Sequence, residues 1–308
     1  MTPLSWTEAL PADCRGGAVT LGNFDGVHRG HQSIIAETAR HARAAGGPAV
    51  AVTFDPHPLQ ILRPDSFQPV LTTVPQRAEL LRQYGAAQVV VLPTSPALLQ
   101  HSATQFFEEV VRERLAARVV VEGYNFRFGR NREGTNETLR ELCAAAGVSF
   151  VVVPPYTLDG QPVSSSRVRD ALVQGQIRAA AALLGRPYQL AGTVVAGQRR
   201  GQTLGFPTAN LDELATLIPA NGVYAVHVHH AAARYAGAAN VGPNPTFGEQ
   251  ARKVEVHLIG YAGADLYGQL LRIDFLERLR DTRRFASAAE LTQQLHQDVS
   301  AAARIAAV

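Results

Sequence analysis

The chain has 308 residues, of which 46% are hydrophobic and 18% charged, and its formal net charge at pH 7 is +3. This length and apolar content exclude intrinsic disorder and favour two domains with cores of their own. The positive charge is small, and no long run of Lys or Arg occurs. The composition therefore argues against a DNA-binding or membrane-binding arm and fits a protein whose ligands are polyphosphates.

The N-terminal segment and the cysteines bear on the cellular compartment. Residues 1–13 carry Glu8 and Asp13 and lack the basic start and apolar core of a signal peptide. No stretch approaches the roughly 18 apolar residues that span a bilayer. Cys14 and Cys143 lie far apart without metal-ligand spacing, which favours free thiols in a reducing compartment. We expect a cytoplasmic protein with no membrane partner.

Apolar, β-branched runs alternate with helical patterns through the first half of the chain. Near-continuous Val, Ile and Leu strands with helices between them predict an α/β domain, a parallel sheet with helices on both faces. In such a sheet the ligand crevice lies at the carboxyl ends of the strands. The predicted strands are 18–21, 49–54, 88–92, 118–121 and 149–153, and the predicted helices are 32–45, 74–84, 103–115 and 136–146.

Residues 22–31 follow the first of these strands. A glycine-rich turn ahead of a helix gathers free backbone N–H groups and the positive end of the helix dipole, and both attract phosphate. His28 and His31 are three residues apart on the first helical turn, so both imidazoles can face one anion. An ordinary turn with two surface histidines is the alternative interpretation. The position after a buried strand favours the phosphate site.

A second polar run begins after residue 162. Ser164, Ser165 and Ser166 offer hydroxyl donors and N-cap groups, and Arg167 and Arg169 add guanidinium groups suited to phosphate. A solvated, serine-rich turn is the alternative interpretation. The following segment, 174–184, has the pattern of a short helical connector.

From about residue 187 the pattern changes to strand-like runs separated by glycine turns. Nearly alternating apolar and polar residues predict an antiparallel barrel or sandwich. The tail 286–307 has apolar residues at i, i+4 and i+8, which predicts a terminal α-helix. The predicted strands are 189–196, 222–229, 236–241, 253–259 and 270–275.

The first glycine turn of this half is too rich in chemical groups for a plain hairpin. Four glycines, at positions 192, 197, 201 and 205, allow the backbone to approach a ligand closely. Pro207 fixes the turn that presents Thr208 and Asn210, two oxygen donors in an extended segment. A small set of oxygen donors suits Mg²⁺ that keeps waters and nucleotide phosphates among its ligands.

Glu255 stands between valines in an otherwise apolar strand. A carboxylate there loses hydration energy unless it is paired or used, and at the mouth of a barrel it can act as general base for a substrate hydroxyl. The alternative is that Glu255 simply faces water from a half-buried strand. Nearby, the basic cluster at 278, 280, 283 and 284 is by itself typical of a solvated helix face.

Together these motifs resemble the prokaryotic bifunctional riboflavin kinase/FMN adenylyltransferase (FAD synthetase) family over nearly the whole chain. The first half resembles the nucleotidylyltransferase superfamily, whose His-x-Gly-His mark occurs here as His28-Arg29-Gly30-His31. The second half resembles riboflavin kinase through a Gly-Phe-Pro-Thr-Ala-Asn string with a downstream Glu-Val-His. The matching segments are 53–58, 123–129 and 163–169, then 204–211, 222–225, 245–248, 254–257 and 265–268.

The resemblance implies two domains and two reactions. Residues 1–185 would form a Rossmann-like FMN adenylyltransferase domain that includes the helical connector, and 186–308 a riboflavin kinase barrel with a terminal helix. The kinase reaction would convert riboflavin and ATP to FMN and ADP. The adenylyl transfer would convert FMN and a second ATP to FAD and pyrophosphate. Both would use Mg²⁺ with ATP.

The resemblance also implies roles for individual residues. The catalytic candidates are Glu255, His28 and His31, the metal candidates are Thr208 and Asn210, and the flavin candidates are Asn125, Phe126, Phe128 and Arg280. The candidates for ATP and phosphate binding are Gly22, Asn23, Phe24, Asp25, Gly30, Ser164, Ser165, Ser166, Arg169, Gly197, Gly201, Gly205, Pro207 and Thr208.

Three residues depart from the family pattern in the kinase half. Gln202 and Asn244 stand where basic residues are usual, and Gly260 replaces an aspartate. One alternative is therefore a chain in which only the adenylyltransferase works. Another is a flavin-binding regulatory protein without turnover. A nucleic-acid-binding module is disfavoured because no basic stripe with interleaved aromatic residues occurs.

Overall fold

A computed structural model describes residues 4–5, 10–198, 200–243 and 252–307. The chain divides into two compact units. The first comprises Met1–Gln68 and Thr72–Ser164, and the second comprises Pro69–Leu71 and Ser165–Val308. The motif residue Asn244 and the matching segment 245–248 lie outside the described residues.

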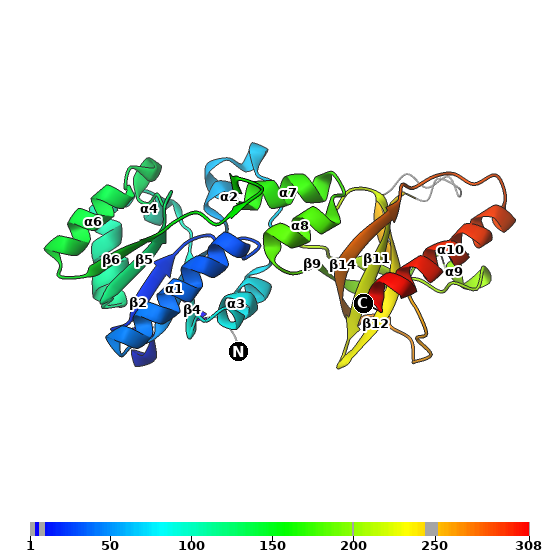
Figure 1. The fold of residues 1–308 in the computed structure, drawn as a ribbon, viewed down its shortest axis with the longest axis horizontal. Helices are drawn as coiled ribbons and strands as arrows, with labels where there is room; N and C mark the ends of the chain where they lie inside the picture. Colours follow the sequence, from blue (N-terminus) through cyan, green and yellow to red (C-terminus); the bar gives the residue numbers. More distant parts are fainter. Residues whose placement is uncertain (1–3, 6–9, 199, 244–251, 308) are drawn as a thin grey trace. The chain divides into compact units, whose positions relative to one another are not determined.

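The first unit is built on a parallel sheet with the strand order β1-β4-β3-β2-β5-β6 (Figure 1). Its central strands are nearly continuous apolar runs, and all four residues of β2 are buried, as parallel strands covered on both faces require. The strands are β1 (Leu4–Ser5), β2 (Ala18–Leu21), β3 (Ala49–Asp55), β4 (Gln88–Pro93), β5 (Val119–Gly123) and β6 (Ser149–Val153).

Helices cover both faces of this sheet. On one face, Ile35 of α1 (Arg29–Ala45) and Leu81 of α3 (Val74–Gln83) pack in one apolar cluster. On the other face, Phe107 and Leu139 pack against β2 and β3. Phe107 begins η3 (Phe107–Arg114), a π-helix that continues α5 (Ala103–Phe106). Leu139 belongs to α6 (Asn136–Ala145). The predicted α/β fold with helices on both faces is confirmed.

Several short elements were not predicted from the sequence. They are too short for a periodic pattern, and most are set by local caps and turns. They are η1 (Ala12–Cys14), α2 (Pro58–Leu62), η2 (Pro64–Ser66), α4 (Pro96–Leu99), η4 (Arg130–Arg132) and the hairpin of β7 (Thr157–Leu158) and β8 (Gln161–Pro162).

The second unit begins with the helices α7 (Ser165–Val173) and α8 (Ile177–Leu184) and continues as a closed antiparallel barrel. The strand order around the barrel is β10-β13-β12-β11-β14-β9. The strands are β9 (Tyr188–Val195), β10 (Ala209–Asp212), β11 (Gly222–His230), β12 (Ala233–Gly242), β13 (Lys253–Leu258) and β14 (Leu270–Arg280).

The barrel interior follows the alternation of its strands. Every second residue of β9 is buried, and Tyr224 and Phe275 meet edge to face inside with ring centroids 5.2 Å apart. The terminal helix α10 (Ala288–Ala306) lies along the outside of the barrel against β11, β12 and β14, as Figure 1 shows. The predicted antiparallel barrel with a terminal helix is confirmed.

Two arginines of the basic cluster lie on a strand. Arg278 and Arg280 end β14, which pairs with β11 through two register shifts. The interpretation of this cluster as a solvated helix face is therefore wrong at these positions. It failed because the bulged pairing with β11 carries the strand beyond residue 275, where the apolar alternation stops.

The connector helices belong to the same compact unit as the barrel. Arg178 of α8 forms an ion pair with Glu277 of β14, and Ala220 donates its N–H to the carbonyl of Leu172 in α7 at 2.9 Å. A domain boundary after residue 185, expected from the sequence, stays a prediction.

Candidate active sites

The loop after β2 brings the two predicted histidines into contact. His28 is the N-cap of α1, and its Nδ1 accepts a hydrogen bond of 3.4 Å from the backbone N–H of His31. The two imidazole rings stack with centroids 3.6 Å apart and an angle of 18° between their planes. The side chains therefore share one place at the helix N-terminus, where backbone N–H groups and the helix dipole attract anions.

The surroundings keep His31 neutral. Burial, the adjacent His28 and the guanidinium of Arg77 together hold the pKa of His31 well below its usual range. Its Nδ1 is buried without a hydrogen-bond partner among the residues that the structure describes. A buried polar nitrogen of this kind is satisfied when a ligand supplies the partner. A phosphate oxygen would do so and would also favour the protonated imidazole.

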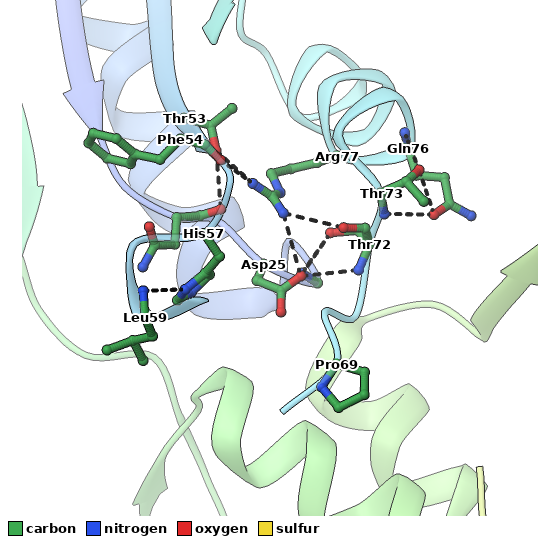
Figure 2. Close-up of polar contacts among 12 residues, drawn as sticks. Asp25, Thr53, Phe54, His57, Leu59, Pro69, Thr72, Thr73, Gln76 and Arg77 are labelled. Carbon is green, nitrogen blue, oxygen red and sulfur yellow. Dashed lines mark hydrogen bonds and ion pairs between the residues drawn. The ribbon is translucent and has the colours of Figure 1, made fainter. Parts of the chain in front are cut away.

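The loop itself is fastened by a buried carboxylate, as Figure 2 shows. Oδ1 of Asp25 accepts hydrogen bonds from the N–H of Thr72 at 3.0 Å and from its hydroxyl at 3.2 Å. The same hydroxyl accepts a bond from the N–H of Gly26 at 3.0 Å. Arg77 Nη2 lies 3.8 Å from Oδ1, and both side chains are at most 3% exposed. The carboxylate of Asp25 thus contacts the protein, and its predicted role in phosphate binding stays a prediction.

Arg77 ties this loop to the neighbouring strand. Its Nη1 donates to the hydroxyl of Thr53 at 3.0 Å and to the carbonyl of Phe54 at 3.3 Å (Figure 2). Thr53 in turn donates to the carbonyl of Asn23 at 3.1 Å. Sequence reasoning missed Arg77. The available signal was its place in α3, four residues before the buried Leu81 and therefore on the apolar face of the helix.

We expect Asp25→Asn to destabilise the first unit by about 3–5 kcal/mol, because it removes the buried negative charge that lies 3.8 Å from the guanidinium of Arg77. The matched control is Glu37→Gln on the surface of α1, where the ion pair with Arg40 is exposed and its loss should cost below about 1 kcal/mol. Urea unfolding followed by circular dichroism measures both. Equal, small losses in the two variants would show that Asp25 does not hold the loop.

The other predicted residues of this loop surround the histidine pair. Phe24 adopts a left-handed backbone conformation, with φ of 46°, and its ring meets His31 edge to face at 5.3 Å. A Cβ at Gly22 would press against this ring at 3.1 Å, and one at Gly30 would lie 3.2 Å from the His28 ring. Both glycines therefore keep room beside the imidazoles.

The predicted serine–arginine run is divided between the units. Ser164 ends the second segment of the first unit, whereas Ser165 and Ser166 open α7 in the second unit. Arg169 donates from Nε to the carbonyl of Pro69 at 3.1 Å, within the second unit. Closure of these four side chains on a triphosphate stays a prediction.

The predicted flavin residues after β5 differ in exposure. Asn125 is exposed, and Phe126 is half-buried and stacks on Phe128 with centroids 5.5 Å apart. Phe128 is itself buried in the core against Phe106, at 6.0 Å. The structure thus gives Phe128 a packing role, and flavin contact by all three residues stays a prediction.

In the second unit, Glu255 lies in a row of polar side chains. It stands directly opposite Asn210 of β10 and directly opposite Asn240 of β12 in the strand register. Residues paired in this way project to the same face of a sheet. The flanking Val254 and Val256 fill the interior, so the row lies on the outer face of the barrel. Sequence reasoning missed Asn240, which interrupts the apolar residues of β12 as Glu255 interrupts those of β13.

The glycine loop packs against Asn210, at one end of this row. A Cβ at Gly197 would overlap the amide of Asn210, and one at Gly201 would overlap the carbonyl of Phe206. Side chains at these positions are therefore excluded. His257 of β13 lies 2.8 Å, Nδ1 to oxygen, from the carbonyl of Pro207. The loop thereby presents Thr208, which is exposed, beside Asn210.

Phe206 anchors the loop to the barrel. Its buried ring meets the ring of His257 at 5.7 Å and that of His296, on α10, at 4.9 Å, both edge to face. The loop, β13 and the terminal helix therefore share one aromatic contact. The predicted phosphate-binding residue Gly205 directly precedes Phe206 and has a left-handed conformation, with φ of 84°.

Arg280, a predicted flavin residue, is held by the terminal helix. Its Nε and Nη2 donate to Asp298, which is buried, at 3.0 and 2.7 Å. Nη1 donates to the carbonyl of Asp281, and the guanidinium lies 5.5 Å from the ring centre of Phe285. These contacts fix the arginine at the end of β14, and its contact with flavin stays a prediction.

The donors around Thr208 suit a magnesium ion. The Thr208 hydroxyl and the Asn210 amide are oxygen donors of the type that Mg²⁺ takes together with phosphates and waters. Among the described residues, no cluster of three or more His, Cys, Asp or Glu side chains forms a metal cage. The Thr208 hydroxyl and the Asn210 amide fit an ion whose other ligands are nucleotide phosphates and waters.

Comparison with known proteins accounts for both halves of the chain. A family model described as FAD synthetase matches residues 10–167, and one described as riboflavin kinase matches residues 184–306. The α/β unit and the barrel, with their sites, thus define a two-domain enzyme that transfers phosphoryl and adenylyl groups to flavins.

Curated relatives span the same two domains. A bifunctional riboflavin kinase/FMN adenylyltransferase from Pseudomonas fluorescens is 37% identical over 97% of this chain and 96% of its own length. One from Escherichia coli K12 is 32% identical over 92% and 90%. The chain belongs to the bifunctional riboflavin kinase/FMN adenylyltransferase family. It phosphorylates riboflavin to FMN with ATP and adenylylates FMN to FAD.

A solved structure shares the fold over the full length. A protein from Streptococcus pneumoniae described as a macrolide-efflux protein matches with a TM-score of 0.85 and 30% identity, covering 96% of each chain. Within the part of this chain that the structure describes, no helix has the length and apolarity needed to cross a bilayer. We take from this similarity the fold alone.

Proposed function

We propose that riboflavin is phosphorylated on the outer face of the barrel, between the glycine loop and the Asn210–Glu255–Asn240 row. The single observation that carries this proposal is the register, which sets Glu255 directly beside Asn210, the residue on which the glycine loop packs at Gly197. The loop backbone holds the ATP phosphates. Glu255 accepts the proton of the terminal ribityl hydroxyl. The hydroxyl oxygen attacks the γ-phosphorus, and ADP leaves.

Thr208 and Asn210 hold Mg²⁺ against the nucleotide phosphates in this proposal. The ion supplies positive charge that offsets the charge developing on the transferred phosphoryl group. The protein contributes position: the bond from His257 to the Pro207 carbonyl and the Phe206 contacts keep Thr208 in place. Arg280 is a candidate for holding the flavin from the barrel side.

We propose that the adenylyl transfer takes place at the loop after β2. A phosphate oxygen of FMN is already a nucleophile, so this step needs no protein base. It attacks the α-phosphorus of ATP, and pyrophosphate leaves. His28 and His31, with Asn23 and the N–H groups at the start of α1, neutralise charge on the α-phosphate and on the leaving group. The buried Nδ1 of His31 supports this role.

Other residues complete this second site. The backbone at 22, 24, 25 and 30 surrounds the phosphates, and Ser164, Ser165, Ser166 and Arg169 close on them. Asn125, Phe126 and Phe128 hold the flavin.

The cytoplasm remains the expected compartment, because Cys14 and Cys143 are both free thiols.

We expect FMN, ATP and Mg²⁺ to yield FAD and pyrophosphate in equal amounts over many turnovers. Chelation of Mg²⁺ should stop this reaction and the phosphorylation of riboflavin, because both neutralise phosphate charge with the ion. Chromatography of flavins with a pyrophosphate assay measures both products. Stoichiometric binding of FMN without pyrophosphate release would indicate a flavin-binding protein and contradict the proposal.

A further inference from the structure

The hydrogen-bond ladder between β2 and β5 ends early. Its paired residues are Ala18 with Val119 and Val19 with Val120, whereas β2 stays paired with β3 as far as Leu21. The next N–H of β2 that faces β5 belongs to Leu21. It donates at 2.7 Å to Oε1 of the Glu122 side chain. A carboxyl group thus occupies the place of a backbone partner.

The side chain of Glu122 takes the place of a backbone acceptor at the point where the strand order reverses. From β2 the chain moves to β3 and β4 on one side of the sheet, and it returns to β5 on the other side. Open α/β sheets bind ligands at such a point, in the crevice beyond the carboxyl ends of the strands. Leu21 leads directly into the histidine loop, and Glu122 leads directly into the turn that carries Asn125.

Burial favours the protonated, uncharged form of Glu122. Its side chain is 2% exposed, and burial raises the pKa of its carboxyl well above the usual range, although the N–H of Leu21 and the hydroxyl of Thr20 oppose that rise. The titratable group that faces it from α6 is Cys143, and burial raises the pKa of this thiol to about 12. A neutral acid keeps a carbonyl oxygen, which can accept the Leu21 bond without a buried charge.

We propose that Glu122 is a positioning residue for adenylyl transfer: its side chain replaces the next ladder partner of Leu21 and holds β2 and β5 apart where the ATP and flavin segments leave the sheet. The inference rests on the proposed use of the loop after β2. The Glu122 acceptor fixes the position of the Leu21 backbone. Because Leu21 is the last residue of β2, its position determines where the histidine loop begins. A shift of about 1 Å in a positioning group can cost a reaction roughly 10²-fold.

The test compares Glu122→Gln with Glu122→Val in the full-length chain. The amide of Gln keeps the carbonyl acceptor, so we expect kcat/KM for FAD formation to stay within about twofold of the parent. Val removes the acceptor and leaves the buried Leu21 N–H unsatisfied, so we expect a loss on the order of 10². Riboflavin kinase activity of the same preparations is the internal control and should not change.

The outcomes separate this inference from the proposed site. Full FAD formation by Glu122→Val overturns the positioning role, and an equal loss in Glu122→Gln overturns the acceptor role. If FAD formation also survives His28→Ala with His31→Ala, the proposed site itself fails. If Glu122→Val does not fold, Glu122→Gln still decides, because a folded Gln variant with the activity lost contradicts the inference.

Stability against pH gives a second readout. Burial raises the pKa of Glu122 in the folded state above the 4.5 of an exposed glutamate, so the parent should lose stability relative to Glu122→Gln as pH rises above 4.5. The difference levels off once pH passes the folded pKa. Thermal unfolding of both proteins across pH 4 to 9, roughly the range spanned by buried and exposed carboxyls, measures it. A constant difference would contradict a neutral acid at Glu122.

Discussion

Replacing His28 and His31 together by alanine should abolish FAD formation while riboflavin is still converted to FMN. The imidazoles stack 3.6 Å apart at the N-terminus of α1, where both can donate to the oxygens of a bound phosphate. Loss of a single donor to developing charge typically costs about 10²–10³-fold. We expect at least that decrease in kcat for FAD formation, measured with FMN and ATP, because both donors are removed.

The control for this variant is His41→Ala. His41 lies on the same helix, α1, and contacts Glu37 and Arg40 on its surface. It should retain both activities. The two-site account fails if the double variant, folded by circular dichroism, also loses FMN formation. It fails equally if FAD formation continues at the parental rate.

Replacing Glu255 by glutamine should lower FMN formation by about 10²–10⁴-fold, the usual contribution of a positioned general base. Gln has the same shape and keeps the place opposite Asn210 and Asn240. It cannot accept the hydroxyl proton. The decrease should appear in kcat and not in the KM for ATP, because the phosphate-binding loop is untouched. Steady-state assays with riboflavin and ATP measure both constants.

The control here is Glu213→Gln. Glu213 is an exposed carboxylate beside the same barrel, where it accepts a bond from Thr193 that a glutamine carbonyl can also accept. It should leave FMN formation unchanged. Glu255→Gln should still make FAD from supplied FMN. A Glu255→Gln protein with parental kinase activity would remove Glu255 from the mechanism.

Much of the fold could be predicted because periodicity reports on burial. The strand at 149–153 and the start of α3 at residue 74 agree with the residues predicted. The end of β14 could not be predicted, because its pairing with β11 is bulged and the residues after 275 no longer alternate. The split of the 103–115 helix into α and π segments was also missed, since both bury the same apolar face.

The parts of the sites that are close in sequence were predictable, and the parts that fold together from a distance were not. His28 and His31 are one helical turn apart, so their contact follows from spacing. The Asp25 carboxylate bonds to Thr72, 47 residues away, and no local pattern indicates that partner. Glu122 likewise acts across 101 residues. Its sequence signal was only a lone carboxylate after three buried valines.

The strand register explains why only part of the barrel site could be predicted from the sequence. The alternation of β13 pointed to Glu255, but its neighbours depend on which strands pair, and pairing is set by the closed barrel. Asn240 therefore became visible only in the structure. The hydrogen bonds of Arg280 also depend on the terminal helix, because their acceptor, Asp298, lies 18 residues further along the chain.

The most direct test of two separate sites is a crossed assay of three proteins with riboflavin, ATP and Mg²⁺, followed by chromatography of the flavins. The parent should form FMN and then FAD. The His28→Ala, His31→Ala variant should accumulate FMN, and Glu255→Gln should leave riboflavin unconverted yet make FAD when FMN is supplied. If either variant lost both activities while folded, or if both kept both, the assignment of one reaction to each domain would be contradicted.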